Sequence, residues 1–113
     1  PAKATVKLPP DVLEYGFNAV VAGMTVDNCP KEFRVNKDYE NAVVAAFEAK
    51  YGKRPAWAGA DARKMIPQRE LQDRFIDYIQ RRDIVMADRS TWCAAGKAEV
   101  AGKTAIGKHL IAR

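Results

Sequence analysis

The chain contains two cysteines, Cys29 and Cys93, which lie far apart in the sequence. Each stands at the edge of a segment with a helical pattern: Pro30 follows Cys29 and ends the first helix, and Cys93 follows Trp92 near the start of the last one. Two cysteines at helix ends are typical of one structural disulfide that closes a long loop. Such a bond predicts that the protein works in an oxidising compartment.

His109 is the single histidine, and it lies near the C-terminal end of the last predicted helix, where a cation interacts favourably with the helix end. A catalytic histidine needs an oriented partner, and the sequence places none beside it. Zinc needs several convergent ligands, which one histidine and a bridged cysteine pair do not supply. A bridged pair is also not a nucleophile. We therefore expect no catalytic residue, no metal and no cofactor.

Paired carboxylates can act as an acid and a base, and Glu70, Asp73 and Asp77 share one face of a predicted helix. Arginines alternate with these carboxylates in the same segment: Arg69, Arg74, Arg81 and Arg82. Opposite charges three or four residues apart are typical of a solvated, ion-paired helix surface. We interpret this segment as such a surface.

Glu99 has two interpretations. Lys103 follows four residues later, so an ordinary ion pair along the helix surface is one of them. The other is a buried carboxylate that contacts a partner protein. The sequence leaves both open.

Trp57 stands between two alanines in a segment without a regular pattern. An exposed aromatic ring in such a loop could anchor a partner, because tryptophan is common among the side chains that dominate binding energy. Trp92, beside Cys93, is instead expected to pack in the core.

Residues 1–10 predict an extended N-terminal arm, because Pro9 and Pro10 are unfavourable in a helix. The apolar side chains of this arm, Val6 and Leu8, could lie along a partner. The predicted partner contacts are therefore Val6, Leu8, Trp57, Glu99 and His109.

Apolar residues at helical spacing predict the elements that position these side chains. The first helix begins at Asp11, whose carboxylate is expected to cap it together with Glu14 as a capping box, and ends at Asn28. Its expected buried stripe comprises Leu13, Phe17, Val20 or Val21, and Met24. The second helix spans residues 37–51, with Asn36 as its cap and Gly52 as its end.

A third helix is predicted from Pro67 to about Arg82, and a fourth from Asp88 or Ser90 to about Ile111. The fourth helix is rich in glycine, which costs about 1 kcal/mol per interior helical position relative to alanine. Either a close approach to a neighbouring helix or a break near Gly102 would explain this composition.

Residues 30–36 are expected to form a loop, and strand signals are nearly absent. We therefore predict an all-α fold: a small bundle of four main helices, closed by one disulfide, with an extended N-terminal arm. The arm covers residues 1–10, and a single helical domain covers residues 11–113, a size that suits one core.

The chain of 113 residues carries a net charge of +5, which favours acidic partners. The positive charges are spread along the chain and no nucleic-acid recognition motif is present, so we expect no nucleic acid partner. No apolar run is long enough to cross a bilayer, and we expect no transmembrane segment. The chain begins with Pro1, which fits a mature protein after removal of a signal peptide, or a shortened chain.

Two elements resemble a known family. They are Asn28-Cys29-Pro30 and the stretch Trp92-Cys93-Ala94-Ala95-Gly96-Lys97-Ala98-Glu99-Val100-Ala101, which is followed by Thr104-Ala105-Ile106-Gly107. The pattern is similar to that of small exported alphaproteobacterial proteins known only as a domain of unknown function. The resemblance covers about a quarter of the chain and leaves residues 31–87 unmatched. It implies a signal peptide, a helical fold and a disulfide between Cys29 and Cys93, but no activity.

The leading hypothesis is a non-catalytic accessory protein of the periplasm. It would be a supernumerary subunit on the periplasmic face of an inner-membrane respiratory or other energy-transducing complex. The alternative is a soluble periplasmic binding or inhibitor module that acts on an envelope enzyme or an anionic ligand. A third hypothesis, an enzyme, would need a pocket that gathers Glu99, His109 or the carboxylates of the third helix.

Overall fold

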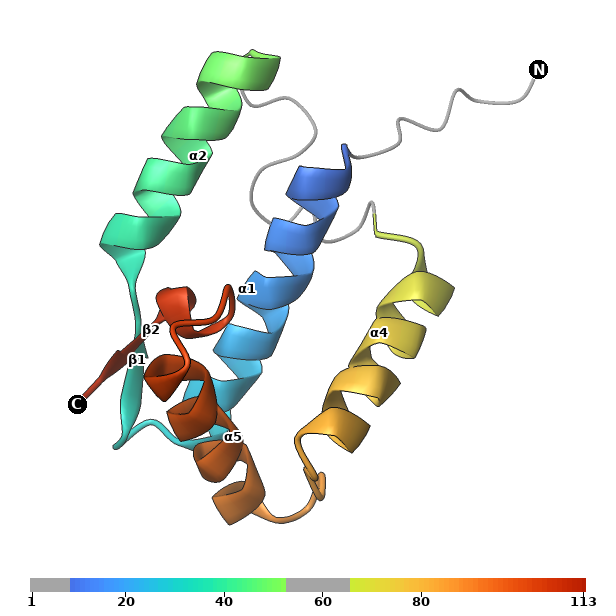
Figure 1. Cartoon of the computed structure of the whole chain (residues 1–113), viewed down its shortest axis with the longest axis vertical. Coiled ribbons are helices and arrows are strands. Elements are labelled where there is room, and N and C mark those ends of the chain that lie inside the picture. Colours follow the sequence, from blue (N-terminus) through green and yellow to red (C-terminus); the bar gives the residue numbers. More distant parts are fainter. Residues whose placement is uncertain (1–8, 53–65) are drawn as a thin grey trace.

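The computed structural model describes residues 9–52 and 66–113 (Figure 1). Its helices are α1 (Pro10–Asn28), α2 (Lys37–Tyr51), α4 (Gln68–Arg81) and α5 (Arg89–Ala101), with a short 3-10 turn, η1 (Gly107–His109). Two strands, β1 (Phe33–Val35) and β2 (Leu110–Ala112), pair antiparallel. The predicted helical fold is confirmed, and a minor sheet is added to it. In Figure 1, α1 runs through the middle of the molecule, with α2 and α4 on opposite sides.

The start of α1 differs from the prediction. Pro10 is the first helical residue, a position that suits proline because its missing N–H would have no partner there. The predicted capping box is wrong: the Asp11 carboxylate accepts from the N–H of Val12 at 3.0 Å and from the Tyr51 hydroxyl at 2.7 Å. Glu14 instead pairs with Arg74 of α4. Pro10 thus removes one of the free N–H groups at this end, and the Asp11 carboxylate accepts from another.

The buried face of α1 includes Phe17 and Val21, as predicted, while Leu13 and Met24 are only half-buried. The fully buried positions are Val12, Phe17, Asn18, Val21, Ala22 and Thr25. The stripe is therefore shifted by about one residue from the one predicted at the start of the helix. The second helix is confirmed at both ends: the Asn36 side chain accepts from the N–H of Tyr39 at 3.1 Å, and Gly52 has a φ of 89°.

The third predicted helix corresponds to α4, with Pro67 immediately before it. The fourth begins as predicted after Asp88, whose carboxylate accepts from the N–H of Ser90 at 3.0 Å, but it ends at Ala101 and not near Ile111. The break near Gly102, which was one of the two explanations for the glycines, is therefore present. Lys103 adopts a φ of 51°, and the chain turns back towards β1.

Close approach, the other explanation for the glycines, also holds at Gly96. A Cβ at this position would lie 2.8 Å from side-chain atoms of both Phe33 and Thr25. A Cβ on Gly107 would clash with the backbone carbonyl of Glu99. Both glycines thus let the last third of the chain pack closely against its neighbours.

Residues 33–35 form a strand, so the prediction of a loop throughout residues 30–36 is wrong. The register pairs Phe33 with Ala112, Arg34 with Ile111 and Val35 with Leu110. Strands of three residues are too short to show the alternation by which strands are recognised in a sequence. Their pairing exists because the turn after α5 brings the C-terminal segment beside β1.

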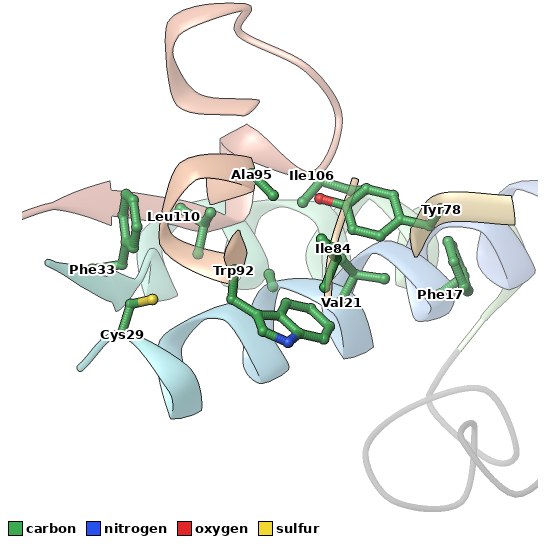
Figure 2. Close-up of a cluster of buried hydrophobic side chains, with 11 residues drawn as sticks. Phe17, Val21, Cys29, Phe33, Tyr78, Ile84, Trp92, Ala95, Ile106 and Leu110 are labelled. Carbon is green, nitrogen blue, oxygen red and sulfur yellow. The ribbon is translucent and has the colours of Figure 1, made fainter. Parts of the chain in front are cut away.

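The main core lies between α1, α4, α5 and the sheet (Figure 2). Its buried residues are Phe17, Val21, Ala22, Cys29, Phe33, Tyr78, Ile84, Trp92, Ala95, Ile106 and Leu110. Trp92 is fully buried, as predicted, and its ring stacks on Phe75 with centroids 6.2 Å apart. A second, smaller cluster is formed by Val12 and Phe47 where α2 meets the beginning of α1.

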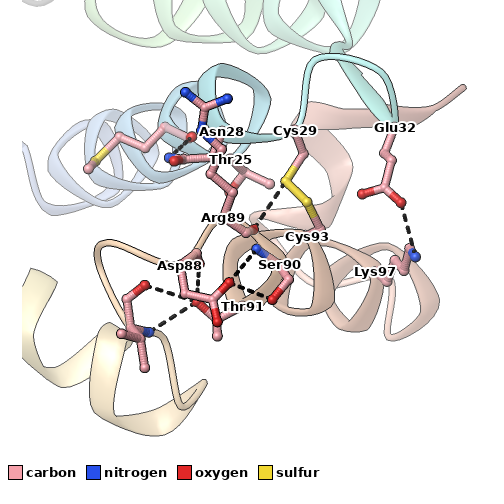
Figure 3. The surroundings of a disulfide bond; sticks show 12 residues. Thr25, Asn28, Cys29, Glu32, Asp88, Arg89, Ser90, Thr91, Cys93 and Lys97 are labelled. Atoms are coloured by element: carbon pink, nitrogen blue, oxygen red, sulfur yellow. Dashed lines mark hydrogen bonds and ion pairs between the residues drawn. A yellow bond between two sulfur atoms is a disulfide. The ribbon is translucent and has the colours of Figure 1, made fainter.

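The predicted disulfide is present (Figure 3). It joins Cys29, directly after α1, to Cys93 in α5, with Cα atoms 5.7 Å apart and a sequence separation of 64. Cys29 is part of the main core. The bond therefore fixes the end of α1 to the helix that carries Trp92. Within residues 9–52 and 66–113, the helices are too short or too polar to cross a membrane.

Candidate functional site

The Glu99 side chain is almost completely buried, with 3% exposure. Its carboxylate accepts from the Arg82 guanidinium at 2.7 Å and from the Thr104 hydroxyl at 2.9 Å. The surface ion pair with Lys103 is therefore wrong, because the turn after Ala101 takes Lys103 off the helix. Glu99 is buried, as the other interpretation had it, but its partners belong to its own chain, so a direct contact with another protein does not fit.

Tyr78 lies beside this ion pair and is fully buried. Burial raises the pKa of the Tyr78 hydroxyl, and the nearby Glu99 carboxylate raises it further. Among the described residues, neither the Tyr78 hydroxyl nor the Nε of Arg82 has a hydrogen-bond partner of good geometry, and the same holds for Trp92 Nε1. Unpaired buried donors cost stability. Of these buried polar groups, the Glu99 carboxylate therefore has the most complete set of hydrogen bonds, through Arg82 and Thr104.

His109 is also buried, with 1% exposure, and lies in η1 and not in a helix, so the predicted interaction with the end of a long helix is wrong. Its Nδ1 is 3.4 Å from the carboxylate of Glu40 in α2. The imidazole packs against the rings of Tyr15 and Tyr39, with centroids 5.1 and 5.0 Å away. The tertiary structure therefore supplies an oriented partner that the sequence did not reveal.

Burial governs the protonation of this cluster. It lowers the pKa of His109, although the Glu40 carboxylate acts in the opposite direction. Burial, together with Glu40 and Tyr39, raises the pKa of Tyr15 to about 12. At neutral pH the imidazole is therefore neutral and the phenol is protonated. This arrangement joins η1 to α1 and α2, and since the ring is covered, it does not fit a direct partner contact by His109.

The ion-paired surface predicted for the third helix is confirmed for two of its three carboxylates. Arg74 Nε lies 3.4 Å from Glu70, and Arg81 Nε lies 2.9 Å from Asp77. Both pairs are spaced four residues apart; the pair of Arg81 and Asp77 is exposed, whereas Arg74 is half-buried and also pairs with Glu14 of α1. The other predicted contacts, Val6, Leu8 and Trp57, lie outside the described residues.

Cys29, Cys93 and Glu32 form a group whose potential ligand atoms lie within 4.8 Å of one another. Metals bind the thiolate form of cysteine, and both sulfurs are committed to the disulfide. Glu32 in turn pairs with Lys97 at 3.1 Å (Figure 3). In the oxidised protein this group is therefore a cross-link with an adjacent ion pair.

A groove of about 270 Å³ lies where the sheet meets the start of α2. It is lined by Arg34, Val35, Asn36, Lys37, Asp38 and Ile111. Sequence reasoning missed this groove, because Ile111 was assigned to a helix and reaches Arg34 only through the pairing of the two strands. It combines apolar and charged side chains, which suits recognition of another molecule.

No protein-family model, curated protein or solved structure matches this chain.

Proposed function

We propose that this protein is a non-catalytic interaction protein of the bacterial periplasm, which acts as an accessory subunit docked on an inner-membrane energy-transducing complex. The disulfide between Cys29 and Cys93 supports an oxidising compartment, because such bonds persist in secreted and periplasmic proteins. The resemblance to small exported alphaproteobacterial proteins supports the same compartment. The basic net charge of +5 suits an acidic partner surface.

The observation that carries the proposal is a group of exposed apolar side chains on one part of the chain. Ile76 on α4 is 53% exposed, and Val85 and Met86, in the turn after α4, are 58% and 53% exposed. Single exposed apolar residues are common, whereas large ones that gather on one surface are typical of binding sites, and Val85 and Met86 are adjacent in the chain. Methionine suits such surfaces because its side chain adapts to its partner.

A second candidate function is a soluble periplasmic binding or inhibitor module. The groove beside α2 favours it, because two basic side chains there, Arg34 and Lys37, could attract an anionic ligand. Both candidates are binding functions, and they differ in whether the partner is a membrane complex.

Native electrophoresis of membranes extracted with a mild detergent separates the two. An accessory subunit is expected to migrate with a large complex, whose other subunits are then identified by mass spectrometry. Migration of all of the protein at its own mass of 12.5 kDa would contradict the accessory role and favour the soluble module.

The apolar group is tested by substituting Ile76, Val85 and Met86 together by glutamine. We expect this variant to leave the complex while it keeps the helical circular dichroism of the parent. The matched control replaces the exposed Gln72 and Gln80 of α4 by alanine and should remain bound. Equal retention of both variants would show that the apolar group is not the docking surface.

A further inference from the structure

The groove beside α2 lies over the outer face of the two-stranded sheet. Arg34 and Ile111 are directly opposite in the register, so their side chains project from the same face. Phe33 and Leu110 project from the other face and are buried in the main core. The first residues of α2, Lys37 and Asp38, line the same groove. The sheet, which is fixed to the core, forms one side of the groove, and the first turn of α2 forms the other.

Two cations line this groove without a carboxylate partner. Within the described residues, neither Arg34 nor Lys37 forms an ion pair, and Asp38, the one acidic residue of the lining, forms none either. Five other basic side chains of the described residues are paired internally, namely Lys50, Arg74, Arg81, Arg82 and Lys97, whereas Arg69 and Arg89 form no ion pair within the same residues. The positive charge of the groove is therefore available to a ligand.

Apolar surface adjoins these cations. Ile111 is half-buried and projects from the same face of the sheet as Arg34, so part of its side chain adjoins the groove. The volume of about 270 Å³ is below the roughly 300–1,000 Å³ of pockets that enclose whole small molecules. It suits a side chain and its neighbours in an extended segment.

We propose that this groove binds an extended acidic segment of a partner protein. An apolar side chain of the segment would lie on Ile111, and an adjacent carboxylate would lie between Arg34 and Lys37. The Asp38 carboxylate could accept a backbone N–H of the same segment. The inference rests on the proposed function as an interaction protein and names the chemistry of one contact.

The direct test is an NMR titration of the ¹⁵N-labelled protein with a hexapeptide of alternating leucine and glutamate, blocked at both ends. We expect chemical-shift changes at residues 34–38 and at Ile111, and weaker binding at higher salt because exposed charges are screened. The hexapeptide of alternating leucine and lysine should give no such changes. Changes that avoid the groove, or no binding of the acidic peptide, would overturn the proposal.

A charge-reversal pair distinguishes the groove from general attraction to a basic protein. Arg34→Glu with Lys37→Glu should weaken binding of the acidic peptide by about tenfold or more, a change of about 1.4 kcal/mol. Arg69→Glu with Arg89→Glu changes the net charge equally at exposed helix starts and should weaken it much less. Equal weakening would contradict a specific site. If the first variant does not fold, Arg34→Gln with Lys37→Gln replaces it, with Arg69→Gln and Arg89→Gln as the control.

The same groove variant separates this inference from the proposed function. If the parent protein migrates with a membrane complex and the folded groove variant does too, the groove inference fails and the accessory role stands. If the parent protein migrates alone but binds the acidic peptide at the groove, the inference stands and the accessory role fails.

Discussion

α2 and α5 are helices of similar length, 15 and 13 residues, but the protein holds them in different ways. α5 contributes Trp92 and Ala95 to the main core and is cross-linked to the end of α1 by the disulfide. α2 buries only Phe47 fully, in a small cluster with Val12. Val43 and Val44 pack half-buried against this cluster, and polar links add to it: Lys50 and Tyr51 with Asp11, and Glu40 with His109.

The difference predicts which of the two helices is held less firmly when the salt concentration or the pH changes. Apolar burial and a covalent bond hold α5, and neither is sensitive to salt or to moderate changes of pH. Exposed ion pairs contribute little and are screened by salt, so the contacts of Asp11 add little to the attachment of α2. We therefore expect α2 to open locally before the main core unfolds. The following experiments test this comparison.

Removal of the disulfide should have the largest effect. Cys29→Ser with Cys93→Ser frees a loop with a separation of 64 residues, which costs about 4 kcal/mol in the chain-entropy account. We expect the thermal midpoint to fall by about 15 °C or more, measured by circular dichroism. The parent protein in the presence of a reductant should behave similarly. An unchanged midpoint, or two free thiols in the native protein, would contradict the cross-linked account of α5.

The buried ion pair of the main core comes next. Glu99→Gln keeps the shape of the side chain but leaves Arg82 without its carboxylate. Breaking a fully buried pair costs about 3–5 kcal/mol, and because the Arg82 side chain is 30% exposed we expect about 2 kcal/mol. Denaturant unfolding measures this loss. The control Asp77→Asn breaks the exposed pair with Arg81 and should cost less than about 1 kcal/mol; similar costs for both variants would argue against a buried role for Glu99.

Two glycines provide a smaller and more local test of packing around α5. Gly96→Ala places a Cβ against Phe33 and Thr25, and the cost of overpacking should exceed the helix-propensity gain by about 1 kcal/mol. Gly23→Ala in α1 meets no atom within 4 Å and should stabilise the protein by up to about 1 kcal/mol. Denaturant midpoints of the two variants should therefore move in opposite directions. A stabilising Gly96→Ala would show that the contact with the sheet is loose.

The smallest effect is expected at the attachment of α2, through His109. Because burial lowers the pKa of His109, the imidazole takes up the proton that would make it cationic less readily in the folded protein than in the unfolded chain. Stability should therefore be full above the ordinary histidine pKa of about 6.5 and decline as the pH falls through that value. Thermal midpoints at about pH 7.5 and about pH 5.5 should differ more for the parent than for His109→Gln.

NMR observation of the single histidine measures its pKa directly. A value at or above about 6.5 would mean that Glu40 outweighs burial, and the pH dependence would then reverse. Hydrogen exchange adds the regional comparison: at the lower pH, amides of α2 should lose protection before those of α5. Equal protection of the two helices would contradict the difference between their attachments.

Local signals allowed much of the fold to be predicted from the sequence. Asn36 and Gly52 mark both ends of α2, because a capping side chain and a glycine with positive φ act within a few residues. Asp88 marks the start of α5 in the same way. The capping box at Asp11 failed because Pro10 occupies the first helical position and the carboxylate finds Lys50 and Tyr51 in α2.

The candidate sites were less predictable, because each joins residues that are distant in the chain. Nothing in the sequence connects Glu40 to His109, or Arg82 to Glu99. The groove depends on the pairing of Arg34 with Ile111. This pairing cannot be recognised in the sequence, because strands of three residues are too short to show an alternating pattern. Two cysteines were an exception, since two thiols allow only one pairing.

By itself, then, the sequence determined the helical class of the fold, most helix ends and the disulfide. Helix ends depend on interactions within a few residues, and the helical class depends on apolar periodicity. The disulfide could be predicted because two cysteines allow only one pairing. Only the tertiary structure decided where α5 stops, that the two short strands pair, and that Glu99 and His109 have partners inside the chain. These outcomes depend on long-range packing, in which burial and close approach outweigh local preference.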